Sequence, residues 1–423
     1  MELASIKHLV ILGGGTAGTM VANRMAKRLS SKDWKVIIVD PNETHLYQPG
    51  LLFLPFGAVD EEDDVRSRAS TLNKKVDWRK TNVVRIDTAK KVVETEQGEP
   101  IRYDLLIIAS GSRIRPDLTE GMQGPAYGKT VHDFYTLPGA LALREVLSKF
   151  TFGRIVVNIV EMPIKCPVAP LEFIFLADDF FRKKGIRDDV ELVYVTPLDG
   201  AFTKPVASKM LSGLLQEKNV RVETEFSCAR VDAERGTIVS WDEREVPFDL
   251  LVTIPTHSGA EFVERSGLGN ELGFIPTDPK TLQARGHDDI FVIGDATDVP
   301  ASKAGSVAHF EAEILTENLT ALIHGDPPEM TFDGHANCFV ETGNGKALLI
   351  DFNYDVEPLP GSYPLPVVGP FSLLEESKVN HLGKLAFRWM YWNGLLPGKP
   401  LPLPAQMSML GKHTLDLTTK EQP

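Results

Sequence analysis

The sequence predicts an α/β protein with two Rossmann-like, glutathione-reductase-type dinucleotide-binding domains and a C-terminal membrane-facing region. Three observations predict this fold: a glycine-rich strand-to-helix turn near the N-terminus, a second strand–loop–helix–strand segment from about residue 154, and an amphipathic helical pattern near the C-terminus. The chain has 423 residues, 43% of them hydrophobic and 24% charged, so it is globular and too long for one ordinary core.

Composition excludes several classes of function. Lys and Arg number 45 against 58 Asp and Glu, and the net charge of −13 disfavours nucleic acid as a partner. No run reaches the roughly 18 apolar residues of a membrane-spanning helix, and the N-terminal residues pass into a strand without a cleavable signal pattern, which predicts a start in the cytoplasm. Only three cysteines occur, with no CxxC pair, so we expect neither a disulfide scaffold nor a metal site.

The first unit begins with HLVILGGGTAGTMVANRM, a strand, a glycine turn and a helical pattern. Gly13 permits the tight turn, Gly15 lets the backbone approach a pyrophosphate, and Gly18 lets the helix pack on the strand. The next strand, KVIIVD, ends in an acid that suits a ribose hydroxyl. A glycine turn of another α/β protein is the less favoured alternative. The nucleotide-binding residues predicted here are Gly13, Gly15, Thr16, Ala17, Gly18, Asp40 and Pro41.

Two later segments indicate which nucleotide binds. The segments 103–116 (YDLLIIASGSRIRP) and 288–315 (beginning DDIFVIGDATD) resemble the Ala-Thr-Gly-like turn and the late Gly-Asp motif of two-dinucleotide flavoproteins. That resemblance implies that Asp295 bonds a ribityl hydroxyl and that the following helix points its N-terminus at the flavin. The three motifs, in this order, predict FAD. The residues assigned here are Ala109, Ser110, Gly111, Gly294, Asp295 and Gly305.

The second unit lacks a glycine loop. Its strand RIVVNIV is followed by EMPIKCPVAP, in which side chains and two prolines would crowd a pyrophosphate and remove amide donors. The next strand ends at Thr196-Pro197, where an acid or a basic residue would be expected for a nicotinamide nucleotide. NAD(P)H is therefore not the predicted electron donor.

Five motifs spread along the chain carry a family resemblance: HLYQPG (45–50), KCPVAP (165–170), IPTHSG (254–259), GDATDVPASKAGSVAHFE (294–311) and NCFVETGNGKA (337–347). With them the chain resembles the sulfide:quinone oxidoreductases and the flavoprotein of flavocytochrome c sulfide dehydrogenase. The resemblance implies FAD-dependent oxidation of sulfide to zero-valent sulfur or polysulfide. Two electrons would pass through FAD to a membrane quinone, ubiquinone or menaquinone.

The resemblance also implies a redox-active pair, Cys166 with Cys338. A disulfide that hydrosulfide can attack leaves a persulfide on one cysteine and a thiolate on the other. Read alone, Cys166 follows Lys165 at a strand-to-helix turn, which favours a lowered pKa, although an inert buried thiol is the alternative. Cys338 read alone is an ordinary strand residue, and we assign Cys228 to packing.

Family members differ in their further cysteines. Many carry a third one near the segment that reads GKTVHDFYTL here, and this chain has none there. Some hold FAD covalently through a cysteine, but neither candidate region contains one, so we expect non-covalent FAD.

The remaining candidates are ionisable or polar side chains. Glu172 is a proton carrier or merely an acid at a helix start. His257 and His132 are candidate bases, with a structural role as the alternative. Lys303 is expected beside the flavin rather than in solvent, and Gln48 is assigned to the cofactor.

The C-terminal stretch NHLGKLAFRWMYWNGLL predicts a helix with Leu382, Leu385, Ala386 and Trp389 on one stripe and Lys384 and Arg388 on another. This pattern suits a helix in a membrane interface, which would make the protein peripheral, although a helix docked on the protein body is an equal alternative. Phe371 and Tyr391 are the candidate quinone contacts, and a homo-oligomer is also considered.

The expected domains are 1–116 with 273–331 for FAD, 117–272 for the degenerate second unit, and 332–423 for the quinone and membrane region. One rival is a type II NADH:quinone oxidoreductase, and a second is a cytochrome c-linked sulfide dehydrogenase. A third is a non-catalytic flavin-binding or redox-sensing protein that uses the cysteines as a switch.

Overall fold

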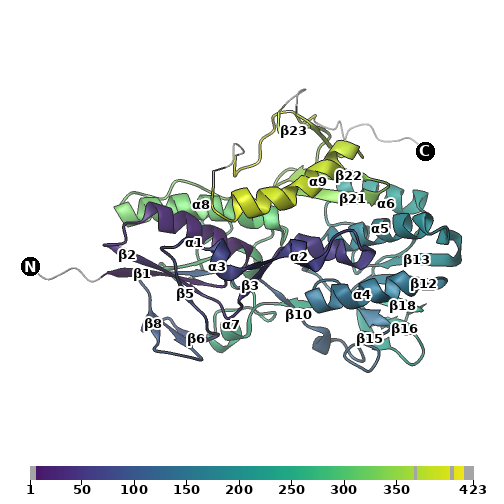
Figure 1. The fold of residues 1–423 in the computed structure, drawn as a ribbon, viewed down its shortest axis with the longest axis horizontal. Coiled ribbons are helices and arrows are strands. Elements are labelled where there is room, and N and C mark those ends of the chain that lie inside the picture. The colour runs from purple at the N-terminus through teal and green to yellow at the C-terminus, as the bar shows by residue number, and fades with distance from the viewer. Residues whose placement is uncertain (1–5, 366–368, 401–403, 414–423) are drawn as a thin grey trace, which may run out of the picture.

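The computed structural model describes residues 6–365, 369–400 and 404–413. Its first sheet has five parallel strands in the order β20-β9-β1-β2-β5, and helices α1 and α8 pack together over it (Figure 1). The elements are β1 (Lys7–Leu12), α1 (Thr16–Arg28), β2 (Trp34–Val39), β5 (Asp77–Arg79), β9 (Leu105–Ile108), β20 (Ile290–Val292) and α8 (Gly305–His324).

Alternation along β1 explains why this sheet is buried on both faces. Leu9 and Ile11 belong to the main core, which also contains residues of α1 and α8, whereas Val10 and Leu12 belong to a second core. Successive side chains of a strand point to opposite faces, so an uninterrupted apolar strand needs a cover on each side.

A second parallel sheet has the order β11-β18-β12-β13-β14. It repeats the arrangement of the first sheet, and each sheet is accompanied by a three-stranded antiparallel one. The two Rossmann-like units expected from the sequence are thus confirmed. The elements are β11 (Val131–His132), α4 (Leu137–Lys149), β12 (Gly153–Ile159), α5 (Ala169–Lys183), β13 (Val190–Val195), α6 (Pro205–Glu217), β14 (Arg221–Glu223) and β18 (Leu250–Ile254), with the antiparallel sheets β6 (Val83–Asp87), β7 (Val92–Thr95), β8 (Ile101–Arg102) and β15 (Cys228–Asp232), β16 (Thr237–Ser240), β17 (Glu245–Pro247).

A four-stranded sheet, β21-β22-β24-β23, forms the C-terminal region, and α9 lies across it at the top of Figure 1. A π-helical turn, η6 (Tyr391–Leu395), continues α9 toward the first sheet. The expected region 332–423 includes positions outside the described residues. The elements are β21 (Ala336–Gly343), β22 (Lys346–Phe352), β23 (Gly361–Tyr363), β24 (Phe371–Leu373) and α9 (Lys378–Met390).

Short elements connect these layers. They are β3 (Thr44–Leu46), α2 (Glu61–Asp64), β4 (Val65–Ser67), α3 (Arg68–Thr71), β10 (Arg113–Ile114), β19 (His257–Ser258) and α7 (Glu261–Arg265), with 3-10 turns η1 (Gln48–Leu52), η2 (Leu54–Phe56), η3 (Pro116–Leu118), η4 (Arg187–Asp189) and η5 (Gly294–Ala296). Within the described ranges, no helix combines the length and the apolarity that crossing a bilayer requires.

Candidate active site

The glycine turn after β1 has the geometry that a pyrophosphate-binding turn requires. Gly13 has a φ of 100°, and a Cβ there would lie 2.4 Å from the carbonyl oxygen of Ala109. A Cβ on Gly18 would lie 1.9 Å from the oxygen of Gly13, whereas a Cβ on Gly15 would meet no atom within 4 Å. Gly13 and Gly18 are therefore fixed by the turn and by packing, and Gly15 leaves an open approach to the start of α1.

The carboxyl ends of four parallel strands surround this turn. Asp40 follows β2 and accepts a hydrogen bond from the amide of Gly14 at 2.7 Å, while Arg68 forms an ion pair with it at 3.2 Å. Residues 109–111 follow β9, and Asp295 follows β20 and accepts a bond from Ser112 Oγ at 3.2 Å. Pro41 is exposed beside Asp40. The carboxyl edge of an open α/β sheet is where such folds bind ligands.

The start of α8 also lies at the carboxyl edge of the first sheet, after β20. Its N-cap residue, Ala304, makes no side-chain capping bond, and a Cβ on Gly305 would meet no atom within 4 Å. Free amides at a helix start favour negative charge. Lys303 is buried and donates to the carbonyls of Asp295 and Thr297 at 2.9 and 2.7 Å, so it holds the turn after β20 rather than lying in solvent.

The cysteine loop joins β12 to α5 and is fastened to the start of α8. Cys166 has a left-handed φ of 46°, which is unusual for a residue with a side chain. Its amide donates to the carbonyl of Lys303 at 2.6 Å, and its carbonyl accepts from the amide of Ala169 at 2.8 Å and from Tyr135 Oη at 3.4 Å. The first unit and the second unit therefore meet at Cys166.

Cys338 reaches the same place from β21. The amide of its neighbour Asn337 donates to Ser306 Oγ at 3.5 Å, in the first turn of α8. Cys338 is also close enough to Cys166 for a thiolate on it to raise the pKa of the Cys166 thiol. Both cysteines, like Cys228, are free thiols in this structure.

The expected lowering of the Cys166 pKa by Lys165 is wrong. Burial raises the pKa of Cys166 well above its ordinary value and the pKa of Cys338 to about 12. Lys165 Nζ instead donates to Gln48 Oε1 at 3.0 Å, and this contact bridges the two units. The ammonium that favours either thiolate belongs to Lys384.

Glu172 and Lys384 form a buried ion pair beside the two cysteines. Glu172 Oε1 also accepts a bond from the amide of Glu341 at 2.7 Å, and Lys384 Nζ donates to the carbonyl of Phe339 at 3.0 Å. Of the stripe of Lys384 and Arg388 expected from the sequence, Lys384 thus lies inward, with its ammonium against a buried carboxylate. Burial raises the pKa of Glu172, and Lys384 opposes that rise.

The two candidate histidines differ in position. His257 is buried, its Nδ1 bonds the carbonyl of Pro255 at 2.9 Å, and its ring meets that of Tyr135 edge-on at 5.3 Å. Burial, reinforced by Lys165 and Lys303, lowers the His257 pKa to about 3, which weakens it as a base at neutral pH. His132 is buried in β11, where its Nε2 lies 2.9 Å from the carbonyl of Lys129.

The two quinone candidates also lie apart. Phe371 packs edge-on against Phe339, the residue after Cys338, with ring centroids 5.2 Å apart. Tyr391 is buried beside the glycine turn, where its hydroxyl lies 2.6 Å from His45 Nε2 and 2.9 Å from Thr16 Oγ1. The environment of Tyr391 favours an anchoring role at the start of α1.

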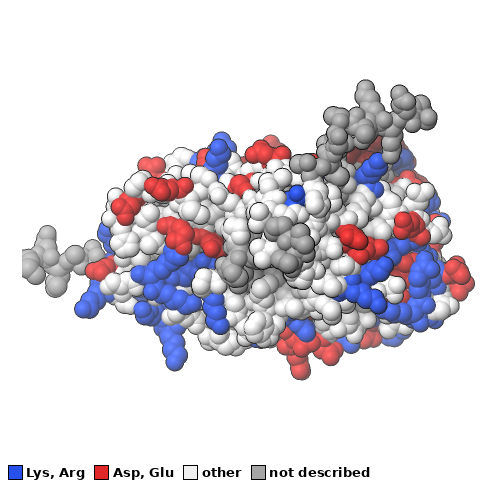
Figure 2. Space-filling view, turned by 90° about the horizontal axis from the view of Figure 1, so that it is seen from above, with Lys and Arg blue, Asp and Glu red and all other residues white. Residues whose placement is uncertain are grey.

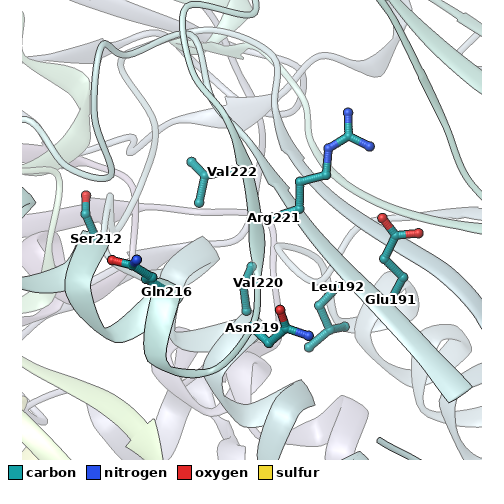
Figure 3. Close-up of a pocket in the computed structure, with 8 residues that line it drawn as sticks. All are labelled: Glu191, Leu192, Ser212, Gln216, Asn219, Val220, Arg221 and Val222. Carbon is teal, nitrogen blue, oxygen red and sulfur yellow. The ribbon is translucent and has the colours of Figure 1, made fainter. Parts of the chain in front are cut away.

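A surface hollow of about 480 Å³ lies elsewhere in the second unit (Figure 3). Glu191 at the start of β13, Gln216 in α6 and Arg221 at the start of β14 contribute to its lining. It is thus at the amino ends of the strands, opposite the edge where dinucleotides bind.

The sequence is similar to a protein family and to several known proteins. A family model described as pyridine nucleotide-disulphide oxidoreductase matches residues 7–157. The mitochondrial sulfide:quinone oxidoreductase of Mus musculus is 27% identical over 399 residues, which cover 92% of this chain and 86% of that protein. This chain is similar to the sulfide:quinone oxidoreductases along most of its length.

The fold agrees with that relationship. The crystal structure of the sulfide:quinone oxidoreductase from Aquifex aeolicus superposes with a TM-score of 0.77 at 21% identity and covers 92% of each chain. A type II NADH:quinone oxidoreductase from Haemophilus influenzae is 25% identical over 371 residues, 76% of this chain and 82% of that protein. The mitochondrial sulfide:quinone oxidoreductase therefore matches more of the chain at higher identity.

The structure brings to the site four residues that the sequence did not identify as site residues. Tyr135 contacts the cysteine loop, Lys384 pairs with Glu172, and Glu341 and His381 extend that pair. Glu341 lies inside one of the family-like motifs, which was an available signal. No signal in the sequence marked Lys384 or His381, because Glu172 lies 212 residues from Lys384 and Glu341 lies 40 residues from His381.

Proposed function

We propose that this protein oxidises sulfide to zero-valent sulfur and passes the two electrons through FAD to a quinone. One observation carries the proposal: two cysteines from separate parts of the chain meet at the start of α8, beside the carboxyl edge of the first sheet. The relationship to sulfide:quinone oxidoreductases supports it.

The residues at that edge fit FAD. The open approach at Gly15 suits a pyrophosphate, and the uncapped starts of α1 and α8 suit negative charge. Ser110 Oγ is buried without a hydrogen-bond partner, as expected of a group that bonds a ligand. The residues proposed to hold FAD are Gly13, Gly15, Thr16, Ala17, Gly18, Asp40, Pro41, Gln48, Ala109, Ser110, Gly111, Gly294, Asp295, Lys303 and Gly305. When bound, FAD would accept two electrons and pass them on.

The sulfur chemistry starts from a Cys166–Cys338 disulfide, the oxidised form of the two thiols. Hydrosulfide attacks one sulfur, an S–S bond forms to it, and the original S–S bond breaks, which leaves a persulfide on one cysteine and a thiolate on the other. Overall, hydrogen sulfide and a quinone give zero-valent sulfur and a quinol, so two electrons and two protons balance. Glu172 is proposed to move a proton, His257 to orient groups as a neutral ring, and Phe371 to contact the quinone.

A quinone acceptor requires access to a membrane, and α9 supplies a suitable surface. Its exposed apolar side chains include Leu382, Leu385 and Trp389, with exposed fractions of 61%, 45% and 72%. Figure 2 shows the face to which α9 belongs: a broad, mostly uncharged centre, with Lys and Arg and also Asp and Glu side chains gathered to either side. We propose that this face rests on a membrane, as apolar interfacial helices with flanking cations do.

The domain boundaries inferred from the sequence are part of the proposal, as are a peripheral location and a homo-oligomer. Boundaries near 116, 272 and 331 fall between elements of different sheets, after β10, after α7 and after α8. This division keeps the FAD strands in one unit and the cysteine loop in the next.

The test is anaerobic addition of reductant to purified protein, followed by flavin absorbance. Sulfide is expected to bleach the flavin and a quinone analogue to restore it, whereas NADH is expected to do neither. The loop after β12 has no glycine and no open turn for a second pyrophosphate. Bleaching by NADH but not by sulfide would instead establish the type II NADH:quinone oxidoreductase alternative.

A further inference from the structure

A chain of four ionisable side chains leads from the two cysteines to the surface. Glu172 on α5 pairs with Lys384 on α9, Glu341 lies on β21, and His381 Nδ1 lies 2.9 Å from Glu341 Oε2. Glu172 and Glu341 are 1% exposed, whereas His381 is 25% exposed. The chain therefore has a buried inner end and an outer end that water can reach.

The four members form two bonded pairs, Glu172 with Lys384 and Glu341 with His381, which meet where Glu172 accepts a hydrogen bond from the amide of Glu341. Glu172 Oε1 accepts from both Lys384 Nζ and the amide of Glu341, and the Glu341 carboxylate raises the pKa of Lys384. His381 and Lys384 are three residues apart on α9, which places them on one helix face. Lys384 lies on the inward side of this face, and His381 lies at its margin, next to the exposed apolar stripe.

The charge of this cluster lets it hold a mobile proton. Two carboxylates face one ammonium, and Asp179 on α5 adds a further negative charge near Glu341. Burial raises the pKa of both Glu172 and Glu341, because a charged carboxylate in a poorly solvated site is disfavoured. A proton can therefore move between the members without a bare charge being buried.

The reaction supplies a proton at the inner end. Hydrosulfide oxidised to zero-valent sulfur releases one proton and two electrons, and the electrons go through FAD to the quinone. Glu172 is a buried carboxylate on the helix that follows the cysteine loop, and its charge raises the pKa of both Cys166 and Cys338. The two cysteines are only partly exposed, so protein groups beside them can carry the released proton to solvent.

We propose that Glu172, Lys384, Glu341 and His381 form a proton path from the cysteine pair to the surface beside α9. Glu172 takes the proton at the cysteines, Lys384 gives one to Glu341 and regains one from Glu172, and His381 exchanges it with solvent. This inference rests on the proposed function, since that reaction generates the proton.

The test uses the outer member, His381, because its substitution leaves the inner Glu172–Lys384 pair intact. In anaerobic stopped-flow mixing with sulfide, His381→Ala is expected to slow flavin bleaching about tenfold. Because His381 is partly exposed, added imidazole can occupy the space left and is expected to restore the rate in a saturable manner. His324→Ala is the matched control, because His324 is an exposed histidine bonded only to its own helix at the carbonyl of Thr320.

A second readout is independent of turnover. The infrared spectrum of the oxidised protein is expected to contain the carbonyl stretch of a protonated, buried carboxyl group, and Glu341→Gln is expected to remove or shift it. Bleaching of Glu341→Gln should be slow and should not respond to imidazole, because the missing member is buried. Far-UV circular dichroism and flavin content confirm that each variant is folded.

The outcomes separate the two proposals. If sulfide does not bleach the unmodified protein, the proposed function fails. If sulfide bleaches it and His381→Ala is equally fast, or is slow without any response to imidazole, the proton path is overturned and the proposed function stands.

Discussion

At the scale of single residues, Cys166 is held in a conformation that few side chains adopt. Its φ of 46° costs on the order of 1–3 kcal/mol, and the bonds of its amide to Lys303 and of its carbonyl to Ala169 hold it there. The sequence predicted the position of Cys166 and its importance. It could not predict the backbone angle, because the partner of the Cys166 amide, Lys303, lies in a distant part of the chain.

The cysteines are expected to differ sharply in their roles. Cys166→Ala and Cys338→Ala should each abolish bleaching of the flavin by sulfide, because a single cysteine cannot form the disulfide that hydrosulfide attacks. Cys228→Ala should retain it, since Cys228 is buried in the core of the second unit. The measurement is bleaching at a fixed sulfide concentration. Loss of bleaching in a folded Cys228→Ala protein would contradict this assignment.

Tyr391 is expected to anchor η6 to the glycine turn. Tyr391→Phe removes the hydroxyl that bonds His45 and Thr16, and it leaves a buried imidazole and a partly buried hydroxyl without that partner. The free energy of unfolding should fall by about 1–2 kcal/mol, as measured by urea titration. Steady-state KM for the quinone should not change, whereas Phe371→Ala should raise it. A rise in KM for Tyr391→Phe would return Tyr391 to the quinone site.

At the scale of elements, α9 shows what periodicity can predict. The apolar stripe of Leu382, Leu385 and Trp389 was predicted from spacing and is exposed as a continuous face. Spacing also grouped Lys384 with Arg388, but only Arg388 stays near the surface, where it pairs with Asp63 at 3.2 Å. A helical pattern assigns faces, and it cannot show that a carboxylate from another element lies beneath one of them.

The exposed stripe is expected to bind lipid. The double substitution Leu382→Ser with Trp389→Ser should reduce co-sedimentation with anionic phospholipid vesicles by about tenfold or more, because burying each side chain contributes roughly 1.5–3 kcal/mol. Trp241→Ser is the matched control: Trp241 is 76% exposed, close to the 72% of Trp389, but belongs to the second unit. Equal losses for Trp241→Ser and the double variant would argue against a membrane-facing α9.

At the scale of the whole molecule, the sequence predicted both parallel sheets but not how they come together. Glycine fingerprints and apolar strands are local signals, so the strands that carry the nucleotide motifs could be recognised in the sequence. The meeting of Cys166 with Cys338 depends on β21 returning to the start of α8, a contact between distant segments that leaves no periodic trace.

Three buried histidines make the molecule sensitive to acid. Burial lowers the pKa of His45, His257 and His309 to about 3, against 6.5 in an unfolded chain. The unfolded state therefore binds up to three more protons between these values, and stability that is present above pH 6.5 is lost as the pH falls toward 3. Protonation of these histidines in the unfolded state should lower the free energy of unfolding by up to about 4 kcal/mol for each unit by which the pH falls.

Urea unfolding at a series of pH values measures this slope. His309→Leu should reduce it by about a third, because one of the three histidines no longer takes up a proton. An unchanged slope below about pH 6 in a folded His309→Leu protein would show that acid sensitivity has another origin.

The position of Cys166 and Cys338 has a mechanical consequence. The first cysteine extends from the second sheet, the second belongs to the C-terminal sheet, and both lie against the start of α8. A bond between them would link two parts of the molecule beside the start of α8 and close a loop of about 170 residues. By chain entropy alone, this would destabilise the unfolded chain by roughly 5 kcal/mol. Oxidised protein should thus resist proteases better than reduced protein. Because hydrosulfide breaks this bond in each turnover, the structure around the cofactor would lose its covalent crosslink for part of every catalytic cycle.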